Sequence, residues 1–380
     1  RPSSFRLSRL HPLPCFLRYR SHFPQSRLCH TYDFGDCGRG EEIKLKMNIL
    51  YLHKENWEKD YIGNKLAPNE IYFSKSFEET PKDILDSAEI LSVFVSHQCK
   101  AEEMTKLPNL KLIAARSTGF DYVDIPLARS KNIEVVYVPS YGENTVAEFA
   151  FALLLSLSRK IADAHEQIKE TGAFTQSNLR GFDLKDKTIG IIGTGRIGAN
   201  MIRMAKGFGM NVVAFDPFPK QNLDHELGFK YIGFEELLNQ SDVISLHAPL
   251  NEHTHHMINK NNISQMKKGV FFINTARGGL IETEALEQAL EMGIIAGAGL
   301  DVLEEEKDMS DEVSLLNNPN SKIEELKNVL ANHYLMRHPR VIVTPHIAFN
   351  TTEAIHRILD TTIKNILSFT KGEVKNKTPI

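Results

Sequence analysis

The stretch that decides the fold is TIGIIGTGRIGANMIRMAKGFGMNVVAFD, residues 188–216. An apolar run of strand type leads into the pattern Gly193-x-Gly195-x-x-Gly198, and apolar residues at helical spacing follow it. A second apolar run then ends in Asp216. A strand, a glycine-rich turn, a helix and a second strand form a β-α-β unit, which is typical of folds built on parallel sheets.

The spacing gives each of these residues a physical role in binding a dinucleotide. Gly193 allows the tight turn, Gly195 lets a pyrophosphate approach the backbone, and Gly198 allows close packing of helix on strand. The helix N-terminus offers free N–H groups to the phosphates, and Arg196 can add a contact. Asp216 would bind ribose hydroxyls and repel a 2′-phosphate, so the pattern predicts NAD rather than NADP. A packing turn without ligand is the alternative, and the strand-turn-helix context disfavours it.

The rest of the chain repeats the alternation of strand and helix patterns. From Met47 onwards it predicts an α/β fold with two Rossmann-like domains built on parallel sheets. Strands are expected at 48–52, 90–95, 111–115, 133–138, 187–193, 211–216, 242–250, 269–276, 294–302 and 341–345. Helices are expected at 144–165 and 351–369. Residues 307–340 should form a long surface excursion with a helix near 322–331.

Bulk composition narrows the class of protein. With 380 residues and a net charge of −3, the chain shows no basic character that would favour nucleic acid or an anionic membrane. No apolar run approaches the ~20 residues needed to cross a bilayer. The spacing of Cys15, Cys29, Cys37 and Cys99 fits no zinc motif, which favours a reducing, cytoplasmic setting.

Residues 1–46 differ in composition from the remainder of the chain. They contain nine Lys/Arg and four Asp/Glu, with no acidic residue before Asp33. An Arg/Ser-rich, acid-poor start is typical of a transit peptide, but four prolines in the first 24 residues would interrupt an amphipathic helix. We favour a disordered leader or a non-native extension translated from upstream sequence, with a targeting peptide as the alternative.

Three polar residues stand just past expected strand ends: Arg277 in INTARGGLIE, Glu306 in GAGLDVLEEE and His346 in VTPHIA. Together with VPSYGENTVAEFAFALLLSLSRK at 138–160, these motifs resemble the D-isomer-specific 2-hydroxyacid dehydrogenases, and the D-lactate dehydrogenase branch in particular. The resemblance runs from about Met47 to the C-terminus.

The resemblance implies that a small 2-keto acid, pyruvate first, is reduced with NADH to the D-2-hydroxy acid. Arg277 would hold the substrate carboxylate and polarise its carbonyl. His346 would be the general acid in reduction and the base in oxidation. Glu306 would hydrogen-bond the other imidazole nitrogen, fix the tautomer and favour the charged ring.

Further contacts are implied by the same resemblance. In RSTGFDYVD, the backbone N–H groups of Ser117, Thr118 and Gly119 would bind the substrate carboxylate, and Tyr141 would line the pocket. Asp301 would sit near the nicotinamide. The full set of implied NAD contacts is Gly193, Gly195, Arg196, Ile197, Gly198, Asp216, Ala248, Pro249, Thr254, Thr275, Ala276 and Asp301.

The implied architecture is an NAD domain inserted into a second domain. Residues 47–145 and 347–380 would form a discontinuous, flavodoxin-like substrate domain, and residues 146–346 the NAD-binding Rossmann domain. Substrate would bind in the cleft between them, and hinge closure would exclude water. A homodimer is expected, with the apolar 146–157 helix as an interface element.

Several assignments have rivals. Glu306 ends the acidic run 304–306, and such runs are usually solvated. His247 also follows a strand and precedes a proline nearby, so it competes with His346 for the acid/base role. His253, His255 and His256 look like loop histidines, and no metal site is expected.

The activity also has rivals. A hydroxypyruvate-, glyoxylate- or phosphoglycerate-type dehydrogenase of the same family is one, although a phosphorylated substrate would need more basic groups than Arg116 in the substrate loop. A non-enzymatic NAD(H)-sensing protein, similar to the family's corepressors, is the other.

Overall fold

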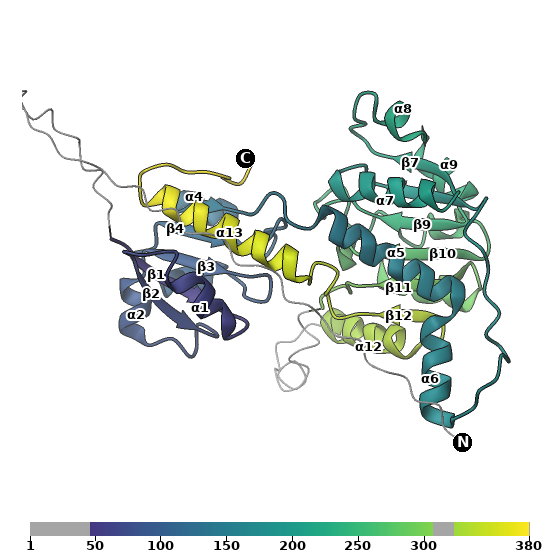
Figure 1. The fold of residues 1–380 in the computed structure, drawn as a ribbon, viewed down its shortest axis with the longest axis horizontal. Coiled ribbons are helices and arrows are strands. Elements are labelled where there is room, and N and C mark those ends of the chain that lie inside the picture. Colours follow the sequence, from purple (N-terminus) through teal and green to yellow (C-terminus); the bar gives the residue numbers. More distant parts are fainter. Residues whose placement is uncertain (1–45, 307–322, 380) are drawn as a thin grey trace, which may run out of the picture. The chain divides into compact units, whose positions relative to one another are not determined.

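Two parallel sheets organise the chain. The computed structural model describes residues 46–306 and 323–379, so the leader and the first half of the expected excursion lie outside the described residues. Within the described ranges, one sheet has five strands in the order β2-β1-β3-β4-β5, and the other has seven in the order β12-β11-β10-β9-β6-β7-β8 (Figure 1). Every pairing in both sheets is parallel, which confirms the predicted fold class.

The five-stranded sheet is built from continuous apolar runs. Its strands are β1 (Asn48–Leu52), β2 (Glu70–Ser74), β3 (Ile90–Val93), β4 (Leu112–Ala115) and β5 (Glu134–Val136). β3 and β4 are buried along their whole length, as expected of parallel strands covered on both faces. The short helices in this part are α1 (Trp57–Gly63), α2 (Lys82–Ser87), α3 (Ala101–Thr105) and α4 (Ile125–Ser130).

The last helix of the chain returns to this first sheet. Helix α13 (Thr352–Phe369) begins where the Thr351 hydroxyl accepts a hydrogen bond from the Ala354 N–H at 3.2 Å. Its apolar side packs in one core with strands β1 and β4. Segments more than 200 residues apart in the sequence thereby share one core.

The seven-stranded sheet carries the glycine-rich unit. Its strands are β6 (Thr188–Ile192), β7 (Asn211–Phe215), β8 (Lys230–Tyr231), β9 (Val243–Leu246), β10 (Val270–Asn274), β11 (Ile295–Leu300) and β12 (Val341–Val343). Its helices are α5 (Glu143–Arg159), α6 (Ile161–Thr171), α7 (Arg196–Gly207), α8 (Leu223–Leu227), α9 (Phe234–Gln240), α10 (Thr283–Glu291) and α12 (Ile323–Arg337), with 3-10 turns at Ile263–Gln265 and Gly278–Leu280. Strand order reverses between β6 and β9, and ligands bind at the carboxyl edge of such a reversal.

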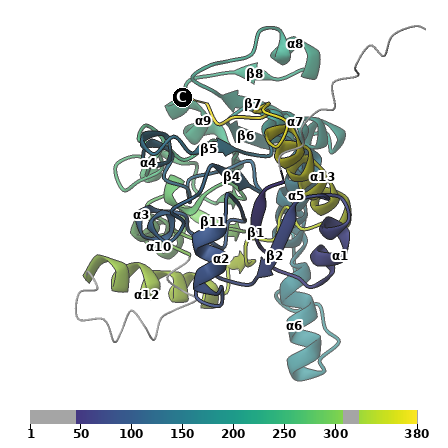
Figure 2. The same ribbon diagram turned by 90° about the vertical axis from the view of Figure 1, so that its left-hand side faces the viewer.

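The single helix expected over 144–165 is wrong, because the structure divides it. α5 ends at Arg159, Lys160 adopts a left-handed φ of +52°, and α6 starts at Ile161. The apolar stripe of α5 packs inside the chain, against α7 and β11. By contrast, α6 buries none of its residues and projects away from the seven-stranded sheet in both views (Figures 1 and 2).

Two short strands were not expected from the sequence. β8 has only two residues, and β2 has only three apolar or aromatic residues between Glu70 and Ser74; each pairs with a neighbouring strand. Within the described residues, no helix is long and apolar enough to cross a membrane.

Candidate active site

The glycine-rich turn joins β6 to α7 at the point where strand order reverses. Gly193 has a φ of +94°, and a Cβ there would lie 2.6 Å from the His247 carbonyl oxygen. A Cβ at Gly198 would lie 2.0 Å from the Gly193 carbonyl oxygen. A Cβ at Gly195 would instead meet nothing within 4 Å. The turn therefore needs glycine at two positions for packing and leaves open space at the third, as a bound pyrophosphate requires.

Asp216 directly follows β7 and lies beside this turn. Its Oδ2 accepts hydrogen bonds from the Thr194 N–H (2.7 Å) and hydroxyl (2.8 Å), and its Oδ1 accepts one from the Phe218 N–H (2.9 Å). An ionised carboxylate can accept about four hydrogen bonds, so roughly one acceptor site remains for a ribose hydroxyl. The residues present fit the adenine ribose of NAD.

Two more strand ends add to this edge. Ala248 and Pro249 follow β9, and Thr275 and Ala276 follow β10. The Thr275 hydroxyl is buried, and no group in the described ranges hydrogen-bonds it. An orphaned buried hydroxyl at the expected cofactor edge is a second observation that fits NAD. Thr254 instead donates to the Pro249 carbonyl oxygen at 2.6 Å and so shapes its own loop.

Arg196 opens α7, followed by Ile197. Its guanidinium pairs with the Glu143 carboxylate at 3.1 Å and so ties α7 to the start of α5. Burial alone would raise the pKa of Glu143, but hydrogen bonds that include the one from Arg196 hold that pKa below its usual value. The side chain of Arg196 is largely exposed and lies next to open Gly195.

The structure brings His346 and Glu306 together. His346 Nδ1 lies 2.5 Å from Glu306 Oε1, across 40 residues of sequence. Within the described parts of the chain, no group hydrogen-bonds the other ring nitrogen, Nε2, so it is available to a substrate. His346 itself has a left-handed φ of +52°, which is rare for a non-glycine residue and common at functional sites.

Asp301 holds the turn that carries His346. Its side chain is fully buried, and its Oδ1 accepts from the Thr344 hydroxyl (2.5 Å) and the Ile347 N–H (2.9 Å). Its Oδ2 accepts from the Ala348 N–H at 2.8 Å, and its backbone carbonyl accepts from the His346 N–H at 2.9 Å. Burial raises the pKa of Asp301, and these hydrogen bonds oppose that rise. Sequence reasoning placed Asp301 beside the nicotinamide and missed this positioning role, for which the only signal was its place at a strand end.

Arg277 follows β10 and lies against the substrate loop predicted from RSTGFDYVD. Its Nε and Nη2 each lie 3.3 Å from Asp121 Oδ1, and a Cβ on Gly119 would come within 1.8 Å of Nη2. The Asn274 side-chain amide donates to the Arg277 carbonyl at 2.9 Å and holds its backbone. Burial raises the pKa of Tyr141, and the positive charge of Arg277 opposes that rise.

Two hydroxyl groups of the substrate loop bind backbone carbonyls. The Ser117 hydroxyl donates to the Gly119 carbonyl at 2.6 Å, and the Thr118 hydroxyl donates to the Val138 carbonyl at 2.8 Å. In the described ranges, the backbone N–H groups of Thr118 and Gly119 donate to no other group. They remain able to bind an anion beside Arg277.

The rival histidine lies in the wall of the cofactor edge. His247 Nε2 is 2.9 Å from the Ser245 hydroxyl, and its carbonyl abuts Gly193. Burial lowers the pKa of His247 to about 4, so the ring is neutral at pH 7. No hydrogen bond links it to a carboxylate in the described residues, which leaves His346 with the better geometry for acid/base work.

The acidic run is not simply a solvated face. Glu304 pairs with His256 at 2.5 Å, and Glu306 pairs with His346 at the same distance, while Glu305 between them is exposed. Glu305 has a left-handed φ of +51°, consistent with a tight turn between the two pairing residues.

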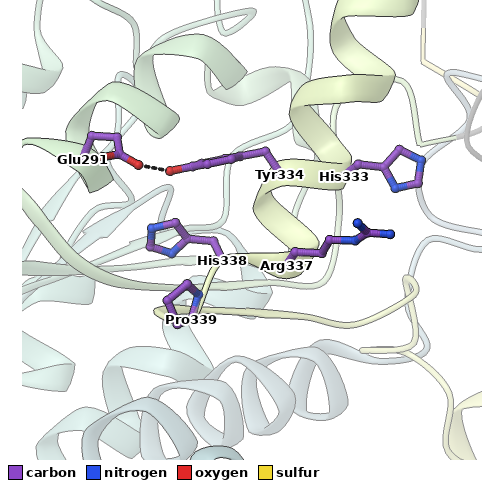
Figure 3. A pocket seen from close by; sticks show the side chains of 6 residues that line it. All are labelled: Glu291, His333, Tyr334, Arg337, His338 and Pro339. Carbon is purple, nitrogen blue, oxygen red and sulfur yellow. Dashed lines mark hydrogen bonds between the residues drawn. The ribbon is translucent and has the colours of Figure 1, made fainter.

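A hollow of about 510 Å³ lies elsewhere, between α10 and α12 (Figure 3). It is lined by Glu291, His333, Tyr334, Arg337, His338 and Pro339. The Tyr334 hydroxyl points at the Glu291 carboxylate and donates a hydrogen bond to it. The hollow contains none of the predicted site residues, so it is separate from the candidate active site.

A Rossmann turn that fits NAD, followed by a histidine-carboxylate pair and an arginine, defines an NAD-dependent oxidoreductase. Residues 151–348 match the NAD-binding domain of the D-isomer specific 2-hydroxyacid dehydrogenases. The chain belongs to this family, and the resemblance in its motifs is confirmed.

Relatives and a solved structure extend the match to both sheets. D-lactate dehydrogenase of Escherichia coli is 36% identical over 86% of this chain and 98% of its own length. The aromatic 2-oxoacid reductase of Clostridium sporogenes is 34% identical over 90% of this chain and 97% of its own. The crystal structure of D-lactate dehydrogenase from Aquifex aeolicus, complexed with NAD and lactic acid, aligns with a TM-score of 0.76 at 35% identity, covering 86% of this chain and 96% of that one.

Proposed function

We propose that the chain reversibly reduces a small 2-keto acid, with pyruvate as the first candidate, to the D-2-hydroxy acid. The observation that carries the proposal is the pair of His346 and Glu306 at 2.5 Å, which follows two strands of the NAD-binding sheet. Arg277, from a third strand of the same sheet, supplies the cation that a 2-keto acid needs.

In this proposal the substrate carboxylate binds Arg277 and the free N–H groups of Thr118 and Gly119. The carboxylate competes with Asp121, whose side chain is half exposed, so that its ion pair with Arg277 is weak. NADH, when bound, supplies the hydride to the carbonyl carbon. Tyr141 would close the pocket from the end of the loop that leads into α5.

The proton comes from His346. Its Nε2 donates to the carbonyl oxygen as negative charge develops there, and Arg277 stabilises the same charge. Glu306 accepts a hydrogen bond from the Nδ1–H, which keeps the ring in one orientation and stabilises the imidazolium before transfer. In oxidation, His346 Nε2 takes the hydroxyl proton back.

We assign the NAD contacts to the residues that surround the carboxyl edge of the seven-stranded sheet. The glycine turn and the start of α7 would hold the pyrophosphate, and Asp216 the adenine ribose. The orphaned Thr275 hydroxyl supports a contact from β10. Because Asp301 is fully buried, it would act on the nicotinamide end by positioning His346 rather than by direct contact.

A small hollow includes Phe349, three residues after His346. Phe94, Arg116 and Phe349 help to line a space of only about 40 Å³, enough for one or two water molecules. The Phe349 ring also lies 6.4 Å from the His346 ring. None of the residues proposed to bind the substrate lines this hollow, so the choice of pyruvate rests on the likeness to the D-lactate dehydrogenases.

The same proposal covers domains, assembly and location. We take residues 47–145 and 347–380 as the substrate domain and 146–346 as the NAD domain, because α13 returns to the first sheet. A homodimer is proposed, but through α6, since the 146–157 helix is buried within its own chain. A cytoplasmic location is proposed from the spacing of the cysteines in the sequence alone.

Two features of α6 support its role as the contact between copies. Ile161 and Ile168 are seven residues apart, so they lie on one helix face, and both are more than 45% exposed. Phe174, just past the helix, is 96% exposed. Apolar side chains gathered on an otherwise unburied helix are typical of an interface.

The test is the rate of NADH oxidation by the full chain with pyruvate, longer 2-keto acids, phenylpyruvate, glyoxylate and hydroxypyruvate. The highest kcat/KM is expected with pyruvate or another short unbranched 2-keto acid. A preference for hydroxypyruvate or glyoxylate would move the chain to another branch of the family. NADH binding without turnover of any substrate would support a sensing role and refute the enzymatic proposal.

A further inference from the structure

Two histidines after β9 and a carboxylate after β11 meet outside the residues assigned to catalysis. His255, His256 and Glu304 each offer one ligand atom, and these three atoms all lie within 4.8 Å of one another. His256 and Glu304 are 48 residues apart in sequence, so only the strand order brings them together. We propose that these three side chains bind a zinc ion.

The core of the group is the contact between His256 and Glu304. His256 Nε2 lies 2.5 Å from Glu304 Oε1. The His255 ring stacks on the His256 ring with centroids 3.8 Å apart and planes inclined by 27°. His256 has a left-handed φ of +49°, which accompanies this face-to-face arrangement of neighbouring rings.

Both ends of that contact are held in place. The second oxygen of Glu304 accepts from the Thr283 hydroxyl at 2.7 Å and from the Thr283 N–H at 3.4 Å, and the side chain is only 11% exposed. The His256 N–H donates to the Gly279 carbonyl at 2.8 Å. A hydrogen bond that orients a ligating carboxylate is a regular feature of metal sites.

The donor set selects the kind of ion. Two imidazole nitrogens and one carboxylate oxygen match the ligands of open zinc sites, which keep a fourth position for water. Calcium and magnesium prefer oxygen ligands alone. The exposed His255 leaves one side of the group open to solvent, as an open zinc site requires.

A modest rearrangement would complete the site. Ligand atoms around tetrahedral zinc lie about 3.4 Å apart, given bonds of about 2.1 Å. The His256–Glu304 contact must therefore open by roughly 0.9 Å as the ion takes the place of the shared hydrogen. His255 must turn off the stack to aim a nitrogen at the ion, and its side chain is exposed.

The bound ion would join the loop after β9 to the segment after β11. Because the ion binds the folded chain and not the unfolded one, zinc should raise the melting temperature in a concentration-dependent manner. This effect depends on neither NADH nor a 2-keto acid, so it can be measured whether or not the proposed activity holds.

The experiment uses the full chain, stripped of metal with a chelator, dialysed, and titrated with zinc against a colorimetric zinc indicator. Wild-type protein should bind one zinc ion through this group, while His255→Asn and Glu304→Gln each weaken that binding at least tenfold. Thr283→Val keeps all three ligands but removes the hydroxyl that orients Glu304, and should weaken binding by about 10- to 100-fold. Cobalt should give the visible absorption of a four-coordinate ion in wild type and lose it in His255→Asn.

His253→Asn is the matched control. His253 is exposed in the same loop and is not one of the three ligands, so this variant should bind zinc as the wild type does. Equal loss in His253→Asn and His255→Asn would mean adventitious surface binding and would overturn the proposal. Wild-type affinity in His255→Asn, or no zinc bound by the wild type, would overturn it as well.

Discussion

Gly119 is the position where one added methyl group tests the placement of Arg277. In Gly119→Ala, the new Cβ would lie 1.8 Å from Arg277 Nη2 and 3.0 Å from its Cζ. Carbon atoms in good contact are about 3.5 Å apart, so the guanidinium must move by roughly 1.7 Å. The group that yields is the far end of a flexible side chain, and Gly119 needs no left-handed backbone, so the fold should persist.

The size of the effect depends on the interactions that the displaced guanidinium gives up. A hydrogen bond to a charged group contributes about 1.5–3 kcal/mol. At about 1.36 kcal/mol for each factor of ten, its loss in the transition state predicts a fall in kcat/KM of roughly 10- to 150-fold. The substrate binds there and NADH does not, so the affinity for NADH should stay unchanged.

Initial rates of NADH oxidation with pyruvate give kcat/KM. Quenching of protein fluorescence by NADH gives the affinity for NADH. Gly195→Ala is the contrasting variant, because its Cβ meets no protein atom within 4 Å but enters the space assigned to the pyrophosphate. It should weaken NADH binding instead. Wild-type kcat/KM in Gly119→Ala would refute the placement of Arg277 against the substrate loop.

The remaining predictions concern four residues. His346→Gln should lower kcat by about 10²- to 10⁴-fold with NADH affinity unchanged, and a normal rate would eliminate its acid/base role. Asp216→Asn should raise kcat/KM for NADPH relative to NADH; a wild type that already prefers NADPH would contradict the ribose assignment. Asp301→Asn replaces one carboxylate oxygen with an amide N–H donor, which would face the N–H groups that Asp301 binds. Both the melting temperature and kcat should therefore fall. Unchanged values would contradict the positioning role of Asp301. Since burial lowers the pKa of His247 to about 4, the unfolded chain binds that proton first as pH falls. Stability in denaturant titrations should therefore fall between about pH 6.5 and 4, less so in His247→Asn, and an identical pH dependence in both would contradict the shift.

The sequence by itself determined the fold class and the cofactor edge, because the signals are local. A β-α-β unit with Gly193, Gly195 and Gly198 specifies its own turn, and the strand after it must end at Asp216 on the same edge. Apolar runs between helical patterns specify parallel strands without knowledge of their order. The break between α5 and α6 depends on the left-handed backbone of Lys160. Hydrophobic periodicity does not predict the backbone conformation of a single residue.

The tertiary structure alone decided which side chains meet. Candidate residues such as Arg277 and His346 were visible because they follow strand ends, but the approach of Gly119 to Arg277 joins residues more than 150 apart. Asp301 likewise binds the turn that carries His346 across more than 40 residues, as His256 binds Glu304. Strand order and register place these groups within hydrogen-bonding distance. No short stretch of sequence determines either one, because both arise when the whole chain packs into two sheets.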